Sequence, residues 1–223
     1  MVTQPPEPAP PLTTKGQATR ERIVRTAAEL MFRHGVAGTS TPAIRDAAGV
    51  SSSQIYHYFA DKEALTRAVI AYQTRAIVDT QAELLGRLDG PTALRAWRDV
   101  VVQAVRDLHC VGGCPLGSLS SELADHDPGA RAALADSFSR WSGAICDGLR
   151  HMIDHGALRA DADPDKLALA MLAALQGGLL LAQAQRDSAA LEAALDTVIE
   201  RIESHTVTPQ GDSRVGERPS GRP

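Results

Sequence analysis

The chain has 223 residues, of which 43% are hydrophobic and 22% charged, so it has the composition of a globular protein and is long enough to bury a core. A mean hydropathy of -0.15 argues against an integral membrane protein. Aromatic residues make up only 4%, which favours helices, because strands prefer aromatic and β-branched side chains. Three cysteines cannot all pair within one chain, and residues 1–14 lack the basic segment and apolar core of a secretory signal, so we expect a reducing cytoplasm.

The net charge of -4 conceals an uneven distribution of charge along the chain. Residues 15–75 contain nine Lys and Arg against five Asp and Glu, whereas residues 76–223 contain 14 against 21. A basic segment on an acidic body indicates that residues 15–75 bind a polyanion and that the rest of the chain does not. Five prolines predict a disordered arm over residues 1–14, and the Gly, Pro, Ser and Arg content of residues 206–223 predicts a disordered tail.

Glycines and N-caps delimit four predicted helices in the N-terminal third. Apolar residues recur at helical spacing in the first helix, and Gly35 ends it. Hydroxyl side chains precede Pro42 at the start of the second helix, which Gly49 ends. Ser51 and Asp61 are expected to cap the third and fourth helices. The expected segments are residues 17–34, 42–48, 52–58 and a longer helix from Lys62 onward.

Helical spacing of apolar residues continues through the rest of the chain, and prolines begin most of the predicted helices. No sustained two-residue alternation occurs, so the sequence predicts an all-α fold. We expect a three-helix helix-turn-helix domain over residues 15–70 and a larger helical domain over residues 71–205. The later helices are expected to start at Pro91, Pro115, Pro128 and Pro164, and the last carries Leu191, Leu195, Val198 and Ile202.

The two short helices, joined by Ala48-Gly49-Val50-Ser51, have the layout of a helix-turn-helix. Ala47 is small enough for the helices to approach closely, and Gly49 can take the left-handed turn. Short or hydrogen-bonding side chains then face outward, where they suit base edges, and Tyr56 and Lys62 suit phosphate oxygens. The predicted DNA contacts are Thr41, Ser51, Ser52, Ser53, Gln54, Tyr56, His57 and Lys62.

The segment from Thr41 to Leu65, TPAIRDAAGVSSSQIYHYFADKEAL, resembles the DNA-binding signature of the TetR family of bacterial repressors. The resemblance covers about residues 19–70, and the pair Ser53-Gln54 departs from the smaller pair that many relatives carry. It implies a repressor that binds a palindromic operator in double-stranded DNA. It also implies a homodimer through the last two helices and release of the operator by a small-molecule effector in the C-terminal domain. Two-fold pairing is expected independently, because one short recognition helix contacts few bases.

The C-terminal domain offers two features whose interpretation stays open. Residues 167–185 carry no charge, which suits a buried interface helix better than a membrane span, since glutamines and a Gly-Gly pair interrupt the apolar run. Aromatic and thiol side chains on apolar helix faces can be core residues or can line an effector pocket for an apolar or electrophilic molecule. The candidate pocket residues are Trp97, Cys114, Phe138 and Trp141.

The cysteines support an alternative function, a regulator that senses electrophiles or oxidants through Cys110 or Cys114. A thiol at a helix start is expected to have a lowered pKa. Zinc needs three or four ligands within reach, and only His109, Cys110 and Cys114 cluster in the sequence, so we expect no metal and no cofactor. An all-α enzyme is the least favoured class, because no phosphate loop or HExxH motif occurs.

Overall fold

The computed structural model describes residues 12–86 and 88–207. These residues form helices throughout, with one isolated bridge between Leu158 and Thr206, which confirms the all-α prediction. The helices are α1 (Thr14–His34), α2 (Thr41–Ala48), α3 (Ser52–Tyr58), α4 (Lys62–Thr74), the π-helical segment η1 (Arg75–Asp79), α5 (Thr80–Leu85), α6 (Pro91–Asp107), α7 (Pro115–Leu123), α8 (Pro128–Asp154), α9 (Pro164–Gln185) and α10 (Ala189–Glu203).

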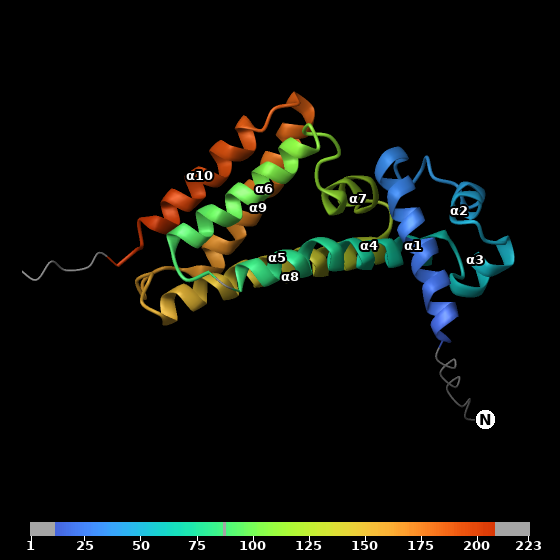
Figure 1. The fold of residues 1–223 in the computed structure, drawn as a ribbon, viewed down its shortest axis with the longest axis horizontal. Helices are drawn as coiled ribbons and strands as arrows, with labels where there is room; N and C mark the ends of the chain where they lie inside the picture. The colour runs from blue at the N-terminus through green and yellow to red at the C-terminus, as the bar shows by residue number, and fades with distance from the viewer. Residues whose placement is uncertain (1–11, 87, 208–223) are drawn as a thin grey trace, which may run out of the picture.

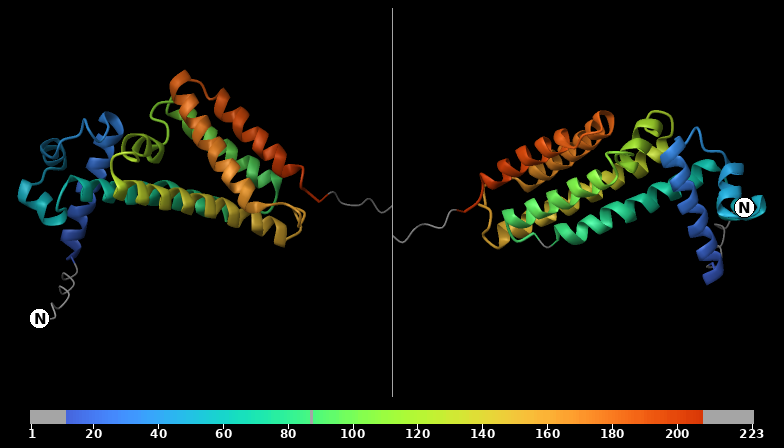
Figure 2. Two further views of the ribbon diagram at one scale, coloured as in Figure 1. Left: turned by 180° about the vertical axis from the view of Figure 1, so that it is seen from behind. Right: turned by 45° about the horizontal axis from the view of Figure 1, so that its top comes forward.

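The helices are arranged as a small head and a long body (Figure 1). The head contains α1, α2 and α3 and lies at one end of the rod formed by α4, η1 and α5. Helix α8 runs along this rod and packs against α9, which packs against α10, and α10 in turn contacts α6 (Figure 2). The short helix α7 contacts α4 and α8 and lies between the body and the head.

Among the described residues, ordered structure extends further toward both termini than the sequence predicts. Helix α1 starts at Thr14, three residues before the predicted start, because the Thr13 hydroxyl accepts a hydrogen bond from the Gly16 N–H at 3.2 Å. The expected arm therefore overlaps the helix at its last residue, Thr14. At the other end, Thr206 pairs with Leu158 instead of belonging to a tail. The rest of the expected arm and tail, residues 1–11 and 208–223, lies outside the described residues.

The fourth predicted helix continues past the expected domain boundary at residue 70. It passes without a break through η1 into α5, and one turn widens to π geometry on the way. The Thr74 hydroxyl donates to the Ile70 carbonyl and is 2.7 Å from the Ser137 hydroxyl of α8. Because α4 packs against both α1 and α8, it belongs to the head and the body at once.

Helix α9 is the central helix of the body and packs against α8 and α10. Its inner side buries Leu167, Met171 and Leu175, and Gly178 allows a close crossing with α10. A Cβ atom at Gly178 would lie only 2.7 Å from the Leu191 Cα. By length and composition α9 could cross a membrane, but its apolar residues on this side serve helix packing.

Candidate DNA-reading head and effector cavity

The turn between α2 and α3 forms as the sequence predicts, from local capping. The Ser40 hydroxyl accepts from the Ala43 N–H, and Gly49 adopts a left-handed conformation with φ of 62°. Ile44, Ala48 and Ile55 are buried in the core, where α2 packs against both α1 and α3. The small residue at the close approach is Ala48, and the prediction for Ala47 is wrong, because Ala47 faces solvent.

Helix α3 presents a polar outer face whose first turn is fixed by a capping box. The Ser51 hydroxyl accepts from the Gln54 N–H at 3.2 Å, and Gln54 Oε1 accepts from the Ser51 N–H at 2.8 Å. The carboxamide oxygen of Gln54 is therefore engaged, and its Nε2 group is the part that remains to meet a base. Of the other predicted contacts, Thr41 is half-buried, and the exposed ones are Ser51, Ser52, Ser53, Tyr56 and His57. Their roles on DNA stay predictions.

Lys62 lies at the junction of the head and the body. Its Nζ group donates to the Val36 carbonyl at 2.6 Å, in the loop between α1 and α2. On the same loop, Glu122 of α7 accepts from the Val36 N–H at 2.8 Å and from the Ala37 N–H at 2.6 Å. No local pattern in the sequence indicates the role of Glu122, because its partners lie more than 80 positions earlier in the chain. A phosphate contact by Lys62 stays a prediction and would use the remaining protons of its ammonium group.

A cavity of about 300 Å³ opens in the body between the rod, α6, α7, α8 and α9. Three of the four predicted pocket residues, Trp97, Cys114 and Trp141, line it together. Phe138 does not, since its side of α8 faces a separate surface groove with Cys146 and Leu169. The residues that line the cavity are Ala76, Ile77, Thr80, Gln81, Leu84, Trp97, Val100, Val101, Ala104, Val105, Gly113, Cys114, Pro115, Trp141, Leu175 and Leu179.

Cys114 precedes α7 as its N-cap residue, but its thiol is not activated. Burial raises the pKa of the Cys114 thiol, and contacts with the Gly117 backbone and other polar neighbours do not outweigh this effect. The expectation of a lowered pKa is therefore wrong. Burial also raises the pKa of Cys146, to about 11, and the Asp165 carboxylate beside it adds to the shift. Within residues 12–86 and 88–207, no three His, Cys, Asp or Glu side chains form a group that could hold a metal.

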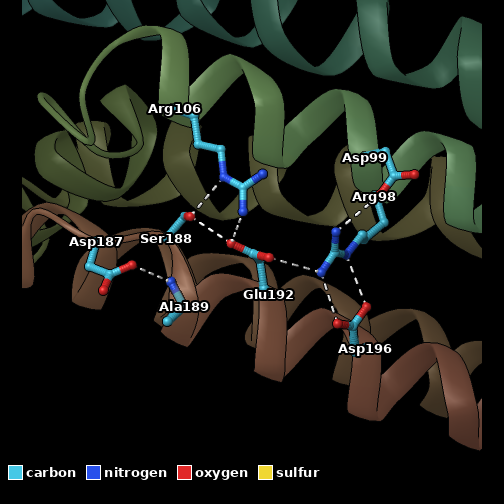
Figure 3. Close-up of polar contacts among 8 residues, drawn as sticks. All are labelled: Arg98, Asp99, Arg106, Asp187, Ser188, Ala189, Glu192 and Asp196. Carbon is cyan, nitrogen blue, oxygen red and sulfur yellow. Dashed lines mark hydrogen bonds and ion pairs between the residues drawn. The ribbon is translucent and has the colours of Figure 1, made fainter.

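Charged side chains join the outer face of α6 to α10 (Figure 3). Arg98 donates to both carboxylate oxygens of Asp196, at 2.9 and 2.8 Å. Arg106 donates to Ser188 at 3.0 Å and to Glu192 at 2.6 Å. The Ser188 hydroxyl and the Arg106 guanidinium lower the pKa of Glu192, which keeps it ionised. Because the inner face of α6 lines the cavity, this network fixes one wall of the cavity to α10.

A helix-turn-helix head joined to a helical body with an apolar cavity is typical of DNA-binding transcriptional regulators, and this is the class of protein that the fold indicates. The sequence model described as "Bacterial regulatory proteins, tetR family" matches residues 23–69. The one described as "Tetracyclin repressor-like, C-terminal domain" matches residues 90–198. The chain belongs to the TetR family of bacterial transcriptional regulators, whose members are regulators and not enzymes.

Individual relatives agree with this assignment along most of the chain. The transcriptional regulator AcuR of Cereibacter sphaeroides is 30% identical over 165 residues, which cover 73% of this chain and 75% of AcuR. An HTH-type transcriptional regulator of Lactococcus lactis is 29% identical over 180 residues, covering 80% of this chain and 90% of that protein. The crystal structure of a TetR transcriptional regulator from Chloroflexus aurantiacus superposes with a TM-score of 0.74 at 29% identity, covering 87% of this chain and 98% of that one.

Proposed function

We propose that this regulator is a cytoplasmic repressor that binds a palindromic operator as a homodimer and releases it when a small molecule occupies the cavity in the body. The observation that carries the proposal is the cavity of about 300 Å³, which is at the lower end of the range for small-molecule sites. Helix α7 extends from its wall to the head, because Cys114 and Pro115 line the cavity and Glu122 holds the loop after α1. A ligand in the cavity can thereby change the position of the head.

The proposed dimer uses the outer sides of α9 and α10. Leu169, Leu180 and Leu181 on α9 are 63%, 65% and 47% exposed, an apolar surface that suits an interface. Small residues of α10, Ala189 and Ala193, are exposed beside it and allow close packing of helices. Two heads fixed in this way would read two half-sites one turn of DNA apart.

Fluorescence anisotropy with labelled DNA tests the DNA-binding half of the proposal. The purified full-length protein is titrated with the DNA flanking its own gene and with a scrambled duplex of equal length, at several salt concentrations. We expect tight binding that weakens with salt, preference for the natural sequence, and a palindromic footprint. A selection from genomic fragments that returns no preferred sequence would contradict sequence-specific regulation.

The dimer interface is tested with a pair of matched leucines. Leu180→Lys places a charge on the proposed interface, whereas Leu108→Lys changes a residue of similar exposure, 64%, at the end of α6. We expect monomers by light scattering for the first variant only, with a loss of operator affinity of about 100-fold because the two half-sites are no longer linked. A dimer that survives Leu180→Lys contradicts the proposed interface.

Covalent modification of Cys114 is the second candidate input to the same cavity. The thiol lies in the cavity wall, where an electrophile that enters would meet it. Burial keeps it protonated at neutral pH, which is why reversible binding is our first proposal. Cys114→Ser and Cys110→Ser variants separate the two inputs. Loss of the response to a quinone in either variant supports thiol sensing, and an unchanged response in both excludes it.

A further inference from the structure

The chemistry of the cavity wall narrows the class of molecule it accepts, and this inference rests on the effector role proposed above. None of the described residues that line the cavity carries a charged side chain. An ion would therefore lose its hydration without gaining a partner of opposite charge, which is strongly unfavourable. Leu84 and Val100 line the cavity with side chains that are 41% and 54% exposed, so the opening toward solvent is apolar as well. Both features select uncharged, largely apolar molecules.

The strongest polar groups in the wall are hydrogen-bond donors. The Trp141 Nε1–H donates to Gln81 Oε1 at 3.2 Å. Only the oxygen of a carboxamide can accept this proton, so the bond fixes which end of the Gln81 amide faces Trp141. Gln81 Nε2 then keeps its N–H donors, and it has no protein partner within the described part of the chain. Thr80, the other polar side chain on the rod, donates its hydroxyl proton to the Ala76 carbonyl and lies on the exposed side.

Trp97 supplies a second unused donor. Its side chain lines the cavity and is only 3% exposed. Its Nε1 atom is buried and has no hydrogen-bond partner among the described residues. A buried donor without an acceptor is costly, and each one calls for an explanation. An acceptor that arrives with a ligand, met by a small turn of the indole toward the cavity, would remove this cost.

We propose that the effector is an uncharged, largely apolar molecule of about two rings that carries a hydrogen-bond acceptor, such as a ketone oxygen, which the donors of Trp97 and Gln81 bind. Its hydrocarbon part lies against the aliphatic side chains of α6 and α9. Molecules of the same shape without the acceptor bind more weakly because they leave the donors unpaired. Carboxylates of similar size bind more weakly still.

Three related probes test the inference: benzophenone, the hydrocarbon diphenylmethane of nearly equal shape, and 4-benzoylbenzoate, which is benzophenone with a carboxylate on one ring. Calorimetry on the full-length protein measures the affinity of each. We expect the ketone to bind about tenfold more tightly than the hydrocarbon, the usual order of effect for one buried hydrogen bond. We expect the carboxylate to bind more weakly than either. Equal affinities for ketone and hydrocarbon, or no binding of either, overturn the inference.

Two variants assign the donors, and a third is their control. Trp97→Phe removes the unpaired N–H, and Gln81→Glu removes the amide donors while keeping an acceptor for Trp141. Each is expected to reduce the preference for the ketone over the hydrocarbon. Trp141→Phe deletes an N–H that is already bonded to Gln81, so that preference should remain. Survival of the preference in both Trp97→Phe and Gln81→Glu contradicts the assignment, provided thermal unfolding shows that all three variants are folded.

Operator release, followed by anisotropy in the same samples, separates this inference from the proposed function. If the probes bind in the expected order and none releases the operator, the ligand class is supported and the effector role fails. If the hydrocarbon and the ketone bind equally and release DNA equally, the effector role stands and the acceptor requirement fails.

Discussion

Gln54 caps α3 through its carboxamide oxygen and also lies on the outer face of this helix, where it is predicted to contact DNA. One substitution can distinguish the capping role from the DNA contact. Gln54→Glu keeps an oxygen that accepts from the Ser51 N–H, so the capping box and the stability of α3 should be preserved. The change removes the Nε2 donor and places a negative charge toward DNA. We expect unchanged thermal unfolding together with a loss of about 1–3 kcal/mol at the base pair that Gln54 contacts. Binding measured on a panel of single-base operator variants checks this.

Lys62→Ala is the comparison for Gln54→Glu. A phosphate contact carries no sequence information, so its loss should weaken binding to all duplexes similarly and reduce the salt slope by about one unit. The Val36 carbonyl loses the Lys62 donor as well, so thermal unfolding of this variant has to be measured beside it. A change in base preference alone would show that Lys62 reads sequence and does not bind phosphate.

The raised pKa of the Cys114 thiol predicts how folding stability and alkylation of this thiol depend on pH. Its pKa is raised in the folded protein, so the thiol stays protonated over a pH range in which an unfolded chain already ionises. The contribution of this thiol to the free energy of unfolding is fully present below the ordinary thiol pKa of about 8.5. It decreases as the pH rises above that value, because the unfolded chain then loses the proton more readily than the folded protein. In a Cys110→Ser, Cys146→Ser double variant, alkylation by iodoacetamide should be slower at neutral pH than that of a cysteine peptide and should accelerate in alkaline solution. Alkylation as fast as the peptide at neutral pH would contradict the raised pKa.

At the scale of elements, local signals predicted the head better than the body. The α2–α3 turn depends on Ser40, Gly49 and Ser51, which lie within a few residues of their partners. The domain boundary at residue 70 missed the long rod, although the sequence from Thr74 to Thr80 contains no proline or glycine to end the helix. The π turn itself has no recognisable mark in the sequence. Phe138 was predicted together with the other pocket residues, and the structure separates it from them. It is three positions from Trp141 on α8, but which side of α8 faces the cavity is decided by distant helices.

The network between α6 and α10 is the clearest case in which two elements depend on charged side chains. Arg98 is largely covered, with 15% of its side chain exposed, and it bonds Asp196 through two nitrogens. We expect Arg98→Ala to lower the free energy of unfolding by about 1–2 kcal/mol. Arg95→Ala, which removes the more exposed pair with Glu203, should have a much smaller effect. Urea denaturation of both variants measures the two decreases in the free energy of unfolding. Equal decreases would show that the burial of Arg98 does not make its ion pair the more stabilising one.

Across the whole molecule, two helices connect the cavity to the proposed DNA-reading head: the rod that continues α4, and the short helix α7. Helix α7 begins beside Cys114 in the cavity wall and ends near Glu122, which accepts from two backbone N–H groups of the loop before α2. Under the proposed function, a shift of α7 caused by a ligand would be transmitted to α2 and α3 through the bonds of Glu122 to this loop. Glu122→Ala should leave ligand affinity unchanged, because Glu122 does not line the cavity.

In Glu122→Ala, ligand binding should no longer weaken operator binding. Coupling between two sites is typically worth about 1–3 kcal/mol, so we expect the ratio of operator affinities without and with ligand to fall toward one. Ser121→Ala is the matched control, because the Ser121 hydroxyl bonds within α7, to the Gly117 carbonyl, and to no other group in the described part of the chain. Hydrogen exchange at the Val36 and Ala37 amides gives a readout independent of DNA and should become faster in Glu122→Ala. If exchange becomes faster while the ligand still releases the operator fully, the signal passes through the contact between α4 and α1 instead.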